Sequence, residues 1–64
     1  MEPIMQFFKY EHLKPELQEV SKPFCLLAEQ IVKTLPRNAE RTVALRKLLE
    51  CKDAAVRAYI AEIA

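Results

Sequence analysis

The sequence has 64 residues and a formal net charge of +1, which leaves room for one domain at most, spanning residues 1–64. So small a charge argues against a DNA duplex as partner, because duplex binding depends on many contacts between cations and phosphates. No apolar run approaches the ~20 residues that a membrane-spanning helix needs. We therefore expect a soluble chain without a membrane partner.

Glycine is absent, and asparagine occurs once, at Asn38. The common two-residue hairpin turns depend on Gly, Asn or Asp at positive φ. The composition therefore argues against a β-rich fold and predicts an all-α protein.

The first informative segment is "FFKYEHL", residues 7–13, which holds three of the five Phe and Tyr residues and the one histidine. A hydrophobic core would explain Phe7 and Phe8. It would not by itself require a tyrosine, a cation and an imidazole beside them.

A helix is predicted next, through about residue 35, because apolar residues recur at intervals of three and four along one face. Pro15 suits the first turn of this helix, where its missing N–H has no partner to lose. Pro23 lies inside the pattern, removes the bond to the Glu19 carbonyl and should bend a continuous helix near residues 19–22. The stripe comprises Leu13, Leu17, Val20, Phe24, Leu27, Ile31 and Leu35.

The segment "TLPRNAER", residues 34–41, predicts the turn between two helices. Pro36 should end the first helix, and the Asn38 side chain should cap the second by accepting from the backbone N–H of Glu40 or Arg41. The second helix is expected from about Ala39 to the C-terminus.

The apolar positions of this second helix span far more than the ~100° that one partner helix covers. Two helices of one chain cannot bury them all, so we expect a helical hairpin that packs against copies of itself, aided by small residues at the contact. These positions are Ala44, Leu45, Leu48, Leu49, Cys51, Ala55, Val56, Tyr59, Ile60 and Ile63.

The two cysteines, Cys25 and Cys51, lie within apolar helical patterns, and no signal-peptide pattern is present. We expect both to be small buried residues, reduced in a cytoplasm, rather than a disulfide.

No motif argues for an enzyme. His12 lacks partners at a metal-ligand spacing, so no metal or other cofactor is expected, and Ser21 lacks a nearby base or a nucleophile elbow. Four charged residues of the second helix are spaced as a ladder of surface ion pairs, which is the simpler interpretation of Arg46, Glu50, Asp53 and Arg57.

Two cations have positions suited to an anion. Arg41 lies in the first turn of the second helix, where unpaired N–H groups already favour negative charge and a guanidinium can hold phosphate oxygens. Lys22 lies beside Pro23, where a helix irregularity exposes a carbonyl and leaves room for a ligand. Composition alone decides neither case.

The pieces "YEHL", "LQEVSKPF", "LAEQIVKTLP" and "ERTVALRKLLECKDAAVRA" together make residues 7–58 resemble a family of small phage proteins. Those proteins defeat the bacterial CBASS defence by sequestering its cyclic oligonucleotide messengers. The resemblance implies a sponge that binds cyclic dinucleotides such as cyclic GMP-AMP, and cyclic trinucleotides, without cleaving them. It also implies an intertwined homohexamer in the cytoplasm of the infected bacterial host, with dinucleotide pockets between subunits and trinucleotide pockets on the three-fold axis.

Three ligand-binding residues follow from the same resemblance. Tyr10 matches the family's base-stacking aromatic, while Phe7 and Phe8 would anchor the segment in the assembly. Lys22 matches the phosphate-contacting lysine, although the spacing between the two motifs is shorter than in longer members. Arg41 matches a basic residue of the trinucleotide pocket.

Two other classes of function stay open. A structural or regulatory helical homo-oligomer would act through protein–protein contacts on the same apolar face. A small DNA-binding regulator of helix-turn-helix type is disfavoured by the low net charge and the lack of a short second recognition helix.

Overall fold

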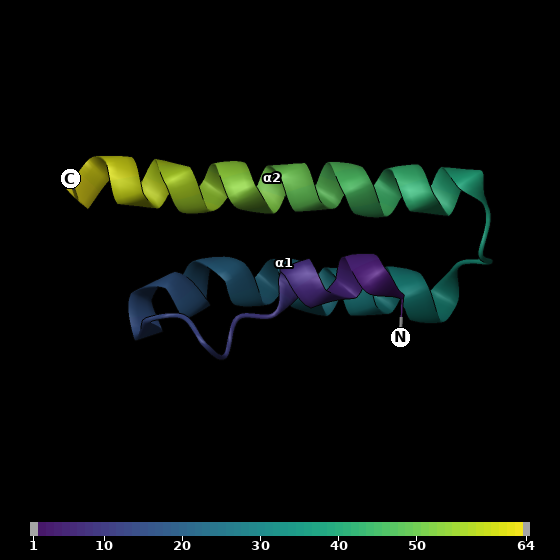
Figure 1. Ribbon diagram of the computed structural model, residues 1–64, viewed down its shortest axis with the longest axis horizontal. Helices are drawn as coiled ribbons and strands as arrows, with labels where there is room; N and C mark the ends of the chain where they lie inside the picture. Colours follow the sequence, from purple (N-terminus) through teal and green to yellow (C-terminus); the bar gives the residue numbers. More distant parts are fainter. Residues whose placement is uncertain (1, 64) are drawn as a thin grey trace.

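Two long helices run antiparallel to each other, and a short N-terminal segment packs against both (Figure 1). The computed structural model describes residues 2–63. Its elements are a 3-10 helix, η1 (Pro3–Phe8), and two α-helices, α1 (Pro15–Thr34) and α2 (Ala39–Ile63). No strand occurs in residues 2–63, so the predictions of an all-α fold and of a helical hairpin are confirmed.

The N-terminal segment is anchored by one of its two phenylalanines. Phe8 is fully buried and packs with Cys25, Ala28, Leu45 and Leu49, which come from both long helices. A 64-residue chain has little core of its own, so this ring supplies a large share of the apolar contact that holds η1 to the hairpin.

The segment between η1 and α1 is tied down by a side chain of α1. The Gln18 amide donates to the carbonyl of Leu13 at 2.7 Å and to that of Glu11 at 3.3 Å. Pro15 occupies the first turn of α1, as predicted. Pro23 lies within α1 without ending it, which confirms that the apolar pattern on both sides of the proline belongs to one helix.

The turn between the long helices forms as the sequence predicts. Leu35, the residue before Pro36, takes an extended conformation and ends α1. The Asn38 side chain then accepts a hydrogen bond from the backbone N–H of Arg41 at 2.9 Å, so it caps the first turn of α2.

The face that α1 buries is rotated away from the predicted stripe. Leu27, expected to be in the core, is 46% exposed, whereas Ser21, Cys25 and Ala28 are buried. The reason is steric: the small side chains of Cys25 and Ala28 let the Phe8 ring pack closely against α1, and larger side chains there would hold it off.

Much apolar surface remains uncovered, as expected for α2 and to a greater extent than expected for α1. Exposing a large side chain by about half forgoes roughly 1 kcal/mol of the 1.5–3 kcal/mol that full burial supplies. The side chain of Ile63 lies outside the described part of the chain. The large apolar side chains that are 43–53% exposed are Phe7, Leu26, Leu27, Leu35, Val43 and Ile60.

The two cysteines differ from each other. Both are free, but Cys25 is buried and Cys51 is exposed, so the expectation of burial is wrong for Cys51 in the single chain. Burial, together with the negative charges of Glu29 and Glu11, raises the pKa of the Cys25 thiol above its ordinary value. The Cys25 thiol therefore stays neutral and behaves as a small core residue.

Candidate functional site

Tyr10 lies just beyond η1, in the segment that leads to α1. Its side chain is half-buried and packs against the core cluster around Phe8. Its backbone carbonyl accepts from the N–H of Leu13 at 3.0 Å, which fixes the local turn. Part of the side chain therefore serves packing, and part of the residue stays accessible to solvent.

Lys22 lies on α1, exposed, directly before Pro23. No carboxylate in residues 2–63 lies within ion-pair distance of its ammonium. A phosphate would therefore meet a solvated, unpaired cation here and would displace no internal contact.

Arg41 has the opposite environment, because its side chain is only 6% exposed. Its guanidinium donates to the carbonyl oxygen of Val32 at 3.0 Å and, more weakly, to that of Leu35 at 3.5 Å. The other terminal nitrogen donates to the carboxylate of Glu2. The side chain of Arg41, in the first turn of α2, is thus paired with the Glu2 carboxylate within the chain.

The position of Glu2 is a feature that sequence reasoning missed. Glu2 precedes η1 and is 39 residues from Arg41, so no local spacing relates the two. One carboxylate oxygen pairs with Arg41 and lies 3.6 Å from exposed Arg37, while the other is buried without a hydrogen-bond partner. The carboxylate is therefore held mainly by its contact with Arg41.

The three predicted ligand residues come from three different parts of the chain. Tyr10 follows η1, Lys22 lies on α1 and Arg41 begins α2. Arg41 borders a hollow of about 250 Å³ with the turn residues Leu35, Pro36 and Asn38, and neither Tyr10 nor Lys22 lines it.

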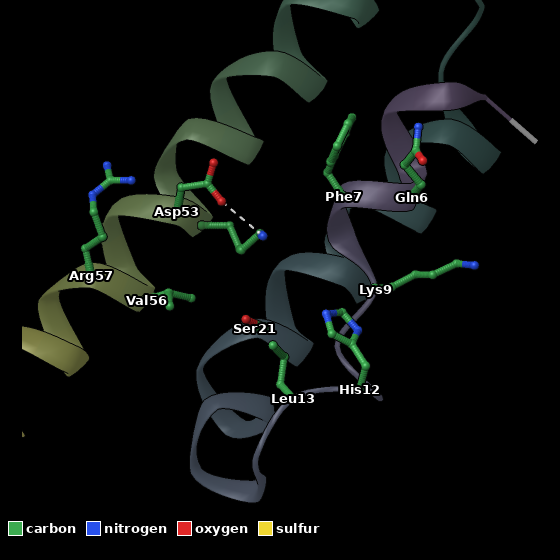
Figure 2. A pocket seen from close by; sticks show the side chains of 10 residues that line it. Gln6, Phe7, Lys9, His12, Leu13, Ser21, Asp53, Val56 and Arg57 are labelled. Carbon is green, nitrogen blue, oxygen red and sulfur yellow. Dashed lines mark ion pairs between the residues drawn. The ribbon is translucent and has the colours of Figure 1, made fainter.

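A larger hollow, of about 360 Å³, lies where η1, the segment after it, α1 and α2 meet (Figure 2). The ammonium of Lys52 lies 3.0 Å from the carboxylate of Asp53 on its border. Residues that line this hollow include Phe7, His12, Ser21, Lys52, Asp53 and Arg57.

The predicted ladder of ion pairs on α2 does not form as expected. In the described residues the pairs on this helix are Lys52 with Asp53 at 3.0 Å and Lys47 with Glu50 at 3.9 Å. Arg57 instead borders the hollow. The predicted pairs do not form because lysines lie nearer in the sequence to the same carboxylates than the arginines four residues away do. Lys47 takes Glu50, and Lys52 takes Asp53.

The described residues form neither a metal-ligand cluster nor a membrane-spanning helix. Residues 2–63 contain no cluster of three or more His, Cys, Asp or Glu side chains able to hold a metal ion. Within that part of the chain no helix has the length and apolar character to cross a membrane.

Comparison with known proteins finds no family model, no curated protein and no solved structure that matches this chain. A function must therefore be argued from the residues and their geometry.

Proposed function

We propose that this chain is a phage-encoded sponge, which binds cyclic oligonucleotide second messengers and sequesters them without cleaving them. Its ligands are cyclic dinucleotides such as cyclic GMP-AMP, and cyclic trinucleotides. Removing these messengers in the cytoplasm of an infected bacterium prevents activation of CBASS effectors. The support for this proposal is the resemblance of residues 7–58 to that family, together with the features below.

The observation that carries the proposal is that six large apolar side chains of the described residues are left about half exposed, in a chain whose predicted ligand residues Tyr10, Lys22 and Arg41 come from three different parts. Each half-exposed side chain would add about 1 kcal/mol of stability if another copy covered it. Assembly would thus supply both the missing core and the missing walls of the ligand sites. We propose a homohexamer, in keeping with the family.

The dinucleotide site would use an aromatic ring and an unpaired cation. A cyclic dinucleotide offers flat bases and two phosphate charges. Tyr10 would stack on a base, for about 1–3 kcal/mol, and Lys22 would hold a phosphate by a charge-assisted hydrogen bond. Two copies that supply the same residues suit a ligand with its own near two-fold symmetry. Neither contact requires a metal or a proton transfer.

The trinucleotide site would use Arg41, and the geometry adds a condition. The guanidinium already holds the carboxylate of Glu2 and two carbonyl oxygens. A phosphate bound to the terminal nitrogen that contacts Glu2 would take the place of that carboxylate, an exchange of one oxyanion for another. In that geometry Arg41 would bind the trinucleotide only after its contact with the Glu2 carboxylate breaks.

The half-exposed apolar side chains also favour a second function, that of a structural or regulatory helical homo-oligomer acting through protein–protein contacts. Such an oligomer would use the same exposed apolar side chains, but it would give Lys22 no role. Ligand binding separates the two functions.

The test is a thermal-shift and calorimetric panel of cyclic GMP-AMP and a cyclic tri-adenylate, with linear dinucleotides as matched controls. A ligand that binds only the folded state raises the melting temperature by mass action, by an amount set by its concentration relative to Kd. We expect the cyclic compounds to stabilise the chain more than the linear ones. Retained assembly without any response to the cyclic compounds would contradict the sponge and leave the structural oligomer.

A further inference from the structure

One side of the hairpin carries no other element of the chain. The Phe8 ring of η1 packs with Cys25 and Ala28 of α1 and with Leu45 and Leu49 of α2. The 3-10 helix therefore covers one side of the two long helices, the side turned toward the reader in Figure 1. Residues 2–63 supply no element that covers the opposite side.

Helical geometry turns apolar residues of both long helices toward that uncovered side. Each of the four core residues of α1 and α2 is directly preceded by an apolar residue, which lies about 100° around its helix. Because α1 and α2 face each other and run antiparallel, this step back along each helix leads to the same side of the hairpin, opposite η1 (Figure 1). None of the four preceding residues is buried, and they are Phe24, Leu27, Ala44 and Leu48.

The α1 half of this open face consists of large side chains. It is most of the apolar stripe that the sequence predicts, and the structure leaves it outside the core. Leu27 and Leu35 are 46% and 48% exposed, while the other members are half-buried. The stripe extends along the helix through Val20, Phe24, Leu27, Ile31 and Leu35.

The α2 half of the open face is shallower, because three of its residues are small. Ala44 and Ala55 are half-buried, and Cys51 is exposed. A two-fold axis parallel to the helices would place α1 of each copy over α2 of the other, with large side chains over small ones. Facing large and small side chains interdigitate, and a two-fold pair requires such a self-complementary patch.

The dimensions of the chain indicate how much surface a partner would cover. A compact monomer of 7.4 kDa exposes about 4200 Å², whereas this chain exposes 4717 Å². Its radius of gyration is 12.3 Å, against about 10.7 Å for a compact domain of this length. A stable interface buries about 800 Å² on each partner. Pairing on that scale would remove the excess exposed surface.

We infer that a second copy of this chain covers the open face, in a two-fold pair whose α1 helices each lie over the partner's α2. The inference rests on the assembly proposed above, for which it names one interface, and it requires no nucleotide. A hexamer would contain three such pairs. Pairing would also shield the thiol of Cys51, which the single chain leaves exposed.

The first experiment compares two neighbouring leucines of similar exposure. Leu27 is 46% exposed and Leu26 is 52% exposed, but Leu26 lies about 100° around α1, outside the open face. Leu27→Glu should raise the dissociation constant of the pair by about 100-fold or more, because a two-fold pair would bury the new carboxylate twice. Leu26→Glu should leave the constant unchanged. Analytical ultracentrifugation measures assembly, and circular dichroism measures folding.

The second experiment uses the unmodified chain, so it decides the matter even if Leu27→Glu fails to fold. The rate at which N-ethylmaleimide labels Cys51 should fall as the protein concentration rises through the dissociation constant, because only the unpaired chain exposes this thiol. Mass spectrometry of peptides separates label on Cys51 from label on the buried Cys25. A rate that does not depend on concentration while the chain assembles overturns the inference.

The outcomes separate this interface from the proposed function. A folded monomer at all concentrations overturns both the pair and the homo-oligomer. An oligomer that survives Leu27→Glu, or that Leu26→Glu weakens equally, overturns the assignment of this face alone. An oligomer that Leu27→Glu disrupts, but that does not bind cyclic nucleotides, supports the pair and contradicts only the sponge.

Discussion

At the end of the hairpin where α1 and α2 are joined, most polar side chains find partners within the chain, although one Glu2 carboxylate oxygen is buried without one. Asn38 caps α2 through the N–H of Arg41, and the Arg41 guanidinium donates to two carbonyl oxygens and to Glu2. Around the hollow between η1, α1 and α2 the opposite holds. The buried Ser21 hydroxyl has no partner, and the ammonium of Lys52 has one, an exposed neighbour on the same helix.

Contacts within the chain separate groups that hold the fold from groups that make no internal bond. A cation with several donors already used, such as Arg41, gives up internal bonds if a phosphate takes those donors. Residue type and helix position alone mark Arg41 as an anion-binding residue but do not reveal these internal bonds.

The largest effect that would test this contrast is on stability. Arg41→Ala removes three internal hydrogen bonds and leaves the Glu2 carboxylate half-buried without its main partner. We expect a loss of about 3 kcal/mol in the free energy of unfolding, because breaking a buried charged contact strands the remaining charge. Urea denaturation followed by circular dichroism measures it.

Arg37→Ala is the matched control, since the Arg37 side chain is 74% exposed and lies 3.6 Å from the same carboxylate. A surface pair of this kind contributes at most about 1 kcal/mol. Equal losses in the two variants would mean that the turn is not held by the buried guanidinium.

The next largest effect concerns Tyr10, which combines packing with a proposed stacking role. Tyr10→Ala should weaken binding of cyclic GMP-AMP by about tenfold or more, through the loss of stacking at about 1–3 kcal/mol per base. Calorimetric titration provides the measurement. Tyr10→Phe keeps the ring and should retain the affinity, so an equal loss in both variants would point to the hydroxyl and not to stacking.

The smallest effect concerns the carboxylate that occupies Arg41. Glu2→Gln should tighten binding of a cyclic trinucleotide by about threefold or more, since a neutral amide holds the guanidinium less strongly than a carboxylate does. Binding of a cyclic dinucleotide should not change. Glu50→Gln removes the same charge from an exposed position on α2 and serves as the control. Unchanged trinucleotide affinity in Glu2→Gln would argue that Arg41 does not contact that ligand.

The sequence predicted the local features of the fold well, because short-range chemistry determines them. The absence of glycine, the spacing of apolar residues and the side chain of Asn38 predict two helices and their turn, and Pro15 and Pro23 fall where helices tolerate them. The buried face of α1 was predicted less well. The spacing of apolar residues predicts that the large side chains face the core. The Phe8 ring instead packs against the small residues of α1, Cys25 and Ala28.

The candidate sites depend on contacts that are distant in the sequence. Glu2 reaches Arg41 across 39 positions, and the hollow gathers Phe7, Ser21 and Lys52 from three elements. Ser21 has no nearby base in the sequence pattern, and that pattern does not reveal its burial. The one available signal was a polar residue at a core position of a helix, and it becomes meaningful only once the buried face of α1 is known.

The central claim, that copies of this chain assemble and hold cyclic messengers intact, is tested most directly by native mass spectrometry of the chain with cyclic GMP-AMP. We predict an oligomer, a hexamer in the simplest case, that carries several ligands of unaltered mass and releases them unaltered when it is denatured. A folded monomer without ligand, or ligand whose mass has risen by one water through ring opening, would contradict the account.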